Sequence, residues 1–118
     1  MTVGGWLDTR QPAPPAALAA ELRRALGPAL SADASTVHDA SLAAAERLVA
    51  EAVAAGCRSR AQAIVLLAAD ALVTYAFEAA ADEPEALGER AAAAVRRFAG
   101  LAAAAPDGRT GASVGGAA

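Results

Sequence analysis

Lysine is absent from the 118 residues of this chain, and histidine and cysteine occur only once each, as His38 and Cys57. A single cysteine cannot form a disulfide within the chain, so we expect a protein of a reducing compartment, the cytoplasm. A Cys/His zinc site takes about four ligands, and carboxylate-bridged metal bundles use Glu-x-x-His pairs, which this sequence lacks. We therefore expect neither a metal nor another cofactor.

Basic residues are not in excess either. Ten arginines stand against thirteen acidic residues, which gives a net charge of −3 and a pI of about 5.0. Domains dedicated to nucleic acid usually carry a basic face and a pI above about 9. The sequence also has no motif of the P-loop, dinucleotide-binding or serine-hydrolase kind. We expect no nucleic-acid partner.

Long uninterrupted apolar runs are lacking as well. A membrane-spanning helix needs about 20 nearly continuous apolar residues. The best candidate, residues 61–81, is interrupted by Gln62, Asp70 and Glu78, and a carboxylate within a bilayer is costly. No basic segment followed by a long apolar one, as in a signal peptide, opens the sequence. We expect a buried helix of a soluble protein here and no membrane span.

What the sequence does have is alanine. It supplies 39 of the 66 hydrophobic residues and leaves only 27 larger apolar side chains. Alanine is the best helix former, and no alternating β pattern occurs. We predict an all-α fold, a small antiparallel bundle of four helices, or of three long helices and a short one, over residues 14–105. Residues 1–13 are expected as an irregular, flexible arm and residues 106–118 as a disordered tail.

Start and stop signals divide the bundle. Gly27 and Gly56 suit left-handed helix ends, and Ser59 with Gln62 has the spacing of a capping box. Asp82 and Glu85 repeat that spacing. The expected helices cover residues 14–26, 35–55, 59–81 and 82–105.

The alanine clusters, at residues 43–45, 91–94 and 102–105, exceed what one small core can use. The third expected helix is apolar over more than half of its circumference, and alanine faces allow close contact with another subunit. We expect a non-enzymatic protein that acts by self-association, as a homodimer, or as an accessory subunit of a larger assembly. The candidate interface residues are Trp6, Leu66, Val73, Phe77, Leu87 and Phe98.

A different function, in small-molecule binding or a small enzyme, would use polar or reactive side chains. The candidates are His38, Cys57, Asp70 and Tyr75, which would have to converge on one pocket near Asp70 and Tyr75. The arginines beside Cys57 favour a thiolate, although a small filler at a helix junction is the plainer interpretation. We expect His38 to be an exposed or half-buried residue at a helix start.

Asp70, Thr74 and Glu78 form one strip of the third expected helix. This strip could face solvent, pair with arginines such as Arg23, Arg47 or Arg90 (on other helices), or line that pocket. A third possible function is that of a regulator or antitoxin-like partner protein, whose arm or tail orders on contact.

Overall fold

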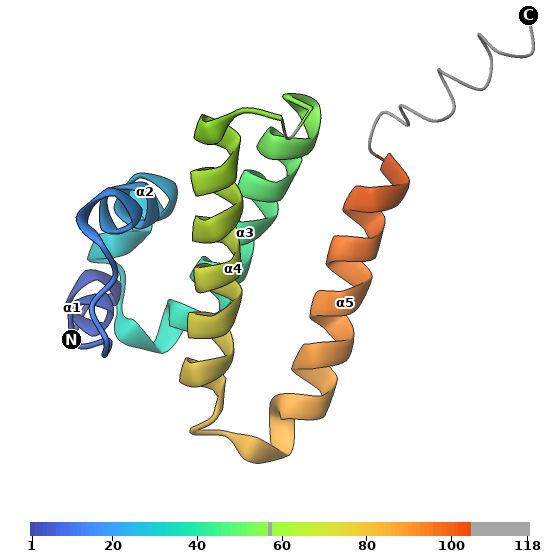
Figure 1. The fold of residues 1–118 in the computed structure, drawn as a ribbon. Helices are drawn as coiled ribbons and strands as arrows, with labels where there is room; N and C mark the ends of the chain where they lie inside the picture. The colour runs from blue at the N-terminus through green and yellow to red at the C-terminus, as the bar shows by residue number, and fades with distance from the viewer. Residues whose placement is uncertain (57, 105–118) are drawn as a thin grey trace, which may run out of the picture.

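The computed structural model describes residues 1–56 and 58–104, and these form the all-α fold that the sequence predicts (Figure 1). Within these residues no strand forms beyond an isolated bridge between Thr2 and Asp33. The elements, with η denoting short 3-10 turns, are α1 (Val3–Asp8), α2 (Ala16–Leu26), η1 (Gly27–Ser31), η2 (Ala34–Thr36), α3 (Val37–Ala54), α4 (Arg60–Ala80), η3 (Pro84–Ala86) and α5 (Leu87–Ala104). The expected tail, residues 106–118, lies outside the described residues.

The centre of the fold is the antiparallel pair α3 and α4 (Figure 1). Leu48 of α3 and Leu72 of α4 are buried in one cluster with fully buried alanines, among them Ala44, Ala45 and Ala68. Because alanine side chains are single methyl groups, they let helix axes approach closely. The alanine excess of the sequence thus serves the contact between these two helices.

Local sequence signals mark the start of α4 and the ends of α2 and α3, as the sequence predicts. The Ser59 hydroxyl accepts the Gln62 backbone N–H at 3.1 Å and caps the first turn of α4. Gly27, after α2, has φ +49°, and Gly56, after α3, has φ +88°. Both values lie in the left-handed region, where a residue without Cβ is favoured.

The first residues do not form the expected irregular arm, because they include helix α1. The Thr2 hydroxyl accepts the Gly5 backbone N–H at 3.0 Å, and Val3 and Leu7, one turn apart, are only 1% and 8% exposed. Gly4 is packed so closely that a Cβ there would lie 3.3 Å from the Leu30 carbonyl oxygen. Packing therefore outweighs the low helix propensity of glycine in this segment.

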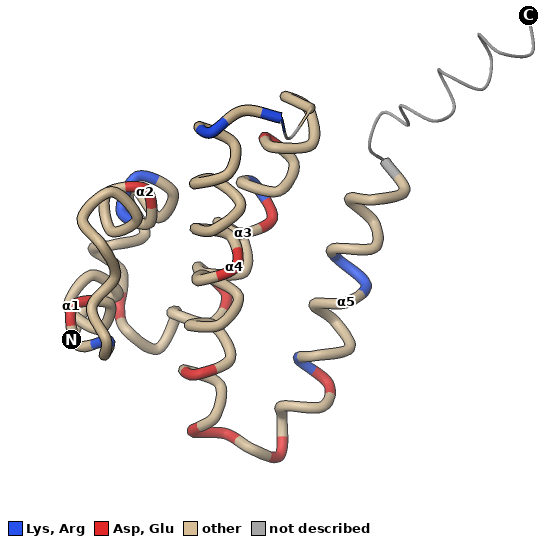
Figure 2. Tube along the Cα trace, in the orientation of Figure 1, with Lys and Arg blue, Asp and Glu red and all other residues tan. Residues whose placement is uncertain are grey.

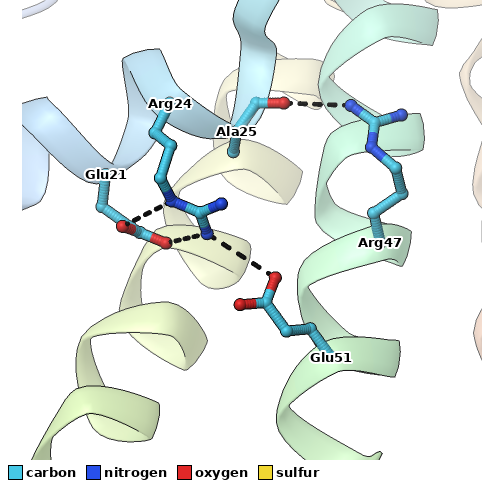
Figure 3. A network of polar contacts seen from close by, with 5 residues as sticks. All are labelled: Glu21, Arg24, Ala25, Arg47 and Glu51. Atoms are coloured by element: carbon cyan, nitrogen blue, oxygen red, sulfur yellow. Dashed lines mark hydrogen bonds and ion pairs between the residues drawn. The ribbon is translucent and has the colours of Figure 1, made fainter.

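A polar network joins α2 to α3 (Figure 3). Arg24 donates from Nε to the Glu21 carboxylate at 3.1 Å and lies 3.6 Å from the carboxylate of Glu51 on α3. Arg47 of α3 donates to the Ala25 carbonyl oxygen at 3.0 Å. Figure 1 shows α2 nearly end-on beside the α3–α4 pair, so α2 crosses this pair rather than extending it antiparallel.

Helix α5 begins later than predicted, at Leu87 rather than near residue 82, because η3 comes first and Pro84 is in it. The expected cap between Asp82 and Glu85 does not form; the η3 start has no side-chain cap. Figure 1 shows α5 leaning away from α4 toward its C-terminal end. It is linked to α3 by the Arg97–Glu46 ion pair and by Ala94 and Phe98, which pack in the cluster that contains Leu42.

Among the described residues, one helix is long and apolar enough to cross a membrane by length and composition alone. It is α4, whose best 18-residue window has a mean hydropathy of 1.7 and is 33% buried inside the fold. A core helix of a soluble protein can have the same length and hydropathy. The expectation of no membrane span stays a prediction.

Candidate functional site

An apolar groove of about 350 Å³ separates α4 from α5. All of its lining residues are apolar. They are Val73 and Phe77 of α4 and Ala91, Ala94, Val95 and Phe98 of α5.

Helical spacing explains why these side chains meet. Val73 and Phe77 lie one turn apart on α4, and the α5 residues recur at intervals of three and four, so each helix presents one stripe. Behind the groove, Leu42 of α3 is buried with Ala76 and Ala94. The groove therefore has a packed floor and two apolar walls.

The apolar surface is open and extends beyond the groove. Val95 is 68% exposed, and Leu66 is 38% exposed and lies two turns before Val73 on the same face of α4. Acidic residues gather at the turn between α4 and α5 (Figure 2). They are Asp82, Glu83 and Glu85.

Of the six candidate interface residues, the structure brings Val73, Phe77 and Phe98 into the groove. Leu87, the first residue of α5, is half-buried and does not line it. The sequence prediction missed Val95, which lines the groove and is 68% exposed. The signal that could have identified Val95 was its position beside Ala94 and three residues before Phe98, which is helical spacing.

Trp6 lies in a separate cluster that fastens α1 to α4. Its ring meets Tyr75 edge-on, with 6.1 Å between ring centroids, and the Arg10 guanidinium carbon lies 3.7 Å from the Trp6 ring centre. Arg10 also pairs with Glu78 at 3.1 Å. Burial, and then the charge of Glu78, raise the pKa of Tyr75, while the charge of Arg10 opposes this shift.

His38 is buried, at 7% exposure, and the expectation of an exposed or half-buried residue is wrong. Its Nδ1–H donates to the Ala76 carbonyl oxygen across 2.9 Å, which satisfies the ring nitrogen inside the fold. The ring also meets Phe77 edge-on at 5.2 Å between centroids. His38 thus supports the groove wall from behind rather than facing solvent.

Asp70 and Thr74 are exposed, and Thr74 donates its hydroxyl to the Asp70 carbonyl oxygen at 3.0 Å. Glu78 does pair with an arginine, but with Arg10. The three arginines named as its possible partners bind elsewhere: Arg23 pairs with Asp8, Arg47 with the Ala25 carbonyl and Arg90 with Glu83.

The polar candidates do not converge. His38 contacts Ala76 and Phe77, whereas Tyr75 contacts Trp6. Asp70 is exposed, and Cys57 lies outside the described residues. Neither the α4–α5 groove nor a smaller hollow beside α1 is lined by any of the three described candidates.

The groove offers apolar contact and no acid, base or nucleophile among its lining side chains. In residues 1–56 and 58–104, no group of three or more His, Cys, Asp or Glu side chains is placed to hold a metal ion. Comparisons of the chain with protein-family models, with curated proteins and with solved structures find no significant match.

Proposed function

We propose that this protein acts without catalysis, through association of two copies at the α4–α5 groove. The observation that carries the proposal is the groove itself, about 350 Å³ lined wholly by apolar residues, with Val95 68% exposed at its wall. Exposed apolar surface of this kind marks interaction sites in soluble proteins.

A second copy supplies a suitable occupant, namely its own α5. Ala91, Val95, Phe98 and Ala102 follow the spacing with which a helix presents apolar residues to a groove. In a two-fold dimer each α5 enters the groove of the other copy. The two-fold symmetry therefore covers the apolar surface of each copy with the same contact.

Charge favours an antiparallel arrangement of the two α5 helices. Glu85 and Glu89 lie at the beginning of this region, and Arg96 and Arg97 lie in its later half. An antiparallel pair places the acidic beginning of one helix beside the basic half of the other, as flanking charges do in helical pairs. Glu89 and Arg96 are exposed and have no ion-pair partner within the described chain, so both are free to pair between copies.

The first test is the molecular mass in solution, measured by sedimentation equilibrium. We expect a concentration-dependent dimer of the 11.6 kDa chain, with a Kd on the order of micromolar because the interface is small. Val95→Arg should remain a monomer, because it places a charge in the groove. Leu67→Arg is the matched control, since Leu67 is 58% exposed on α4 but does not line the groove, and should still dimerise.

A charge exchange tests the arrangement. Arg96→Glu should weaken the dimer, because the new carboxylate would face Glu89 of the other copy, and adding Glu89→Arg should restore it. A wild-type chain that stays monomeric into the high micromolar range, or a Val95→Arg dimer as strong as the wild type, would contradict the proposal. Failure of the charge exchange alone would contradict the antiparallel geometry.

The alternatives receive less support. A small-molecule site near Asp70 and Tyr75 would need side chains that face the same space, and these two have different neighbours. A partner-binding N-terminal arm would need a free segment, and residues 3–8 are helical, with Val3 and Leu7 buried.

A further inference from the structure

The charges beside the α4–α5 groove do not balance. Three ion pairs neutralise charged residues of α4, α5 and the turn between them, namely Glu78–Arg10, Glu83–Arg90 and Arg97–Glu46. Other charged residues between positions 70 and 97 form no ion pair within the described chain. They are Asp70, Asp82, Glu85, Glu89 and Arg96. Four carboxylates thus stand against one guanidinium.

Asp70 lies at the edge of the groove. It precedes Val73 by about one turn of α4 and Phe77 by about two turns, and residues spaced in this way share a face of a helix. Asp70 is exposed, and the hydrogen bond from Thr74 uses its backbone carbonyl rather than its carboxylate. The carboxylate is therefore available at the rim of the groove.

The other unpaired charges do not offset Asp70. Asp82 and Glu85 belong to the acidic turn between α4 and α5, beyond one end of the groove (Figure 2). Arg96 directly follows Val95 on α5, and adjacent residues of a helix do not share a face, so Arg96 lies off the stripe that lines the groove. The surroundings of the groove are accordingly negative.

The groove itself accepts only the apolar part of a ligand. All of its lining residues are apolar, and its volume of about 350 Å³ falls within the roughly 300–1,000 Å³ of ligand sites. A charged group that entered it would lose its hydration without gaining a polar partner. The charge of a bound molecule therefore stays at the rim, where the Asp70 carboxylate attracts a cation and repels an anion.

We propose that the α4–α5 groove binds a hydrophobic organic cation, with its hydrocarbon part against Val73, Phe77 and Phe98 and its charged group beside Asp70. This inference rests on the proposed function, because the groove is the same one. The cation takes the place of the second copy's α5 and so converts the dimer into monomers.

The length of the groove sets the size of the probe. Ala91 and Phe98 are seven residues apart, which is about 10 Å along α5 and close to the length of an extended chain of about eight carbons. Octylammonium is therefore the cationic probe. Octanoate, with a chain of the same length and the opposite charge, is its matched counterpart.

The experiment titrates the isotope-labelled full chain with each probe, below its micelle concentration and at equal ionic strength, and follows the amides by NMR. We expect saturable shifts for octylammonium in residues 73–77 and 91–98 and unchanged amides in α2, with a Kd on the order of 1 mM for a ligand this small. Octanoate should bind at least about fivefold more weakly, and this preference should shrink at high salt because the charges at the rim are screened.

Two exposed carboxylates provide the matched variants. Asp70→Asn should remove most of the preference for the cation. Glu89→Gln changes the net charge equally, but Glu89 is two residues from Ala91 and nine from Phe98, on the opposite side of α5, and this variant should keep the preference. The ratio of the two affinities within one variant cancels any competition from dimerisation.

Sedimentation of the same samples separates this inference from the proposed function. Octylammonium should lower the mass of a dimer toward the 11.6 kDa monomer, and a dimer that persists at saturation would overturn the inference. A chain that is monomeric without ligand would contradict the proposed dimer, whereas saturable, cation-selective shifts would still support the ligand site.

Three NMR results would also overturn the inference. The first is the lack of saturable shifts along the groove in the wild type. The second is equal binding of octanoate and octylammonium. The third is a preference for the cation that Asp70→Asn leaves intact or that Glu89→Gln removes to the same extent.

Discussion

Replacing Leu72 by alanine tests whether an alanine-rich core can close around a lost side chain. Leu72 is 0% exposed in the middle of α4. Five of the thirteen buried members of its cluster are alanine, and alanine has no side-chain rotamer with which to refill a cavity. Removing a buried leucine side chain costs about 2.7–5.0 kcal/mol, and more where the cavity stays open. We therefore expect a loss of about 4 kcal/mol in the free energy of unfolding.

The assay is urea denaturation followed by far-UV circular dichroism. Because dimerisation would link stability to concentration, both variants are best compared in the Val95→Arg background. Leu67→Ala is the control, the same deletion on the same helix at 58% exposure, and should cost less than about 1 kcal/mol. A cost for Leu72→Ala under about 2 kcal/mol, or equal to that of the control, would show that the backbones move together and would refute this reasoning.

Three further predictions concern single contacts. Tyr75 is the only tyrosine, so an ultraviolet titration of the chain reports its pKa, and the midpoint should lie above pH 10. Glu78→Gln should lower this midpoint, because the charge of Glu78 raises the pKa. Since the pKa of Tyr75 is raised in the folded state, its contribution to stability is lost as the pH rises through that pKa. The hydrogen bond from Arg24 lowers the pKa of Glu21 below its ordinary 4.5, so Glu21 contributes stability above pH 4.5 that is lost as the pH falls through the folded pKa. Urea midpoints measured from pH 6 to 3 should fall less steeply in Arg24→Gln, and identical slopes would contradict this role. Ser59→Ala should cost about 1 kcal/mol and Ser59→Asp much less, measured by the same denaturation; equal losses would argue against the cap.

The sequence was most informative where a local rule decides the structure. Ser59 with Gln62 predicts the start of α4, and Gly27 and Gly56 predict the left-handed residues that follow α2 and α3. These signals act within a few residues, so they can be recognised without knowledge of the tertiary fold.

Helix α1 could not be predicted in the same way. Gly4 and Gly5 suggest a loop, and their helical conformation depends on residues about thirty positions away. The Val3 N–H donates to the Ala32 carbonyl at 2.9 Å, and Gly4 lies against Leu30. Val3 and Leu7, four residues apart behind a threonine, were the local sign of a helix.

The candidate site was predictable in part. Spacing placed Val73, Phe77 and Phe98 on facing stripes, but the angle at which α5 leaves the α3–α4 pair decides which side chains stay uncovered. That angle leaves Val95 exposed, and the angle cannot be predicted from the sequence of either helix alone. The burial of His38 likewise depends on the Ala76 carbonyl of a different helix.

The methyl groups between α3 and α4 also affect how the protein responds to temperature. The heat capacity of unfolding grows with the apolar surface that unfolding exposes, and it sets the curvature of stability against temperature. An alanine exposes far less apolar surface than a leucine does, so this core gives a smaller heat-capacity change per residue than the usual value of about 12–15 cal/mol/K. The stability curve should accordingly be shallow, with free energy changing little over a wide range and cold denaturation lying far below freezing.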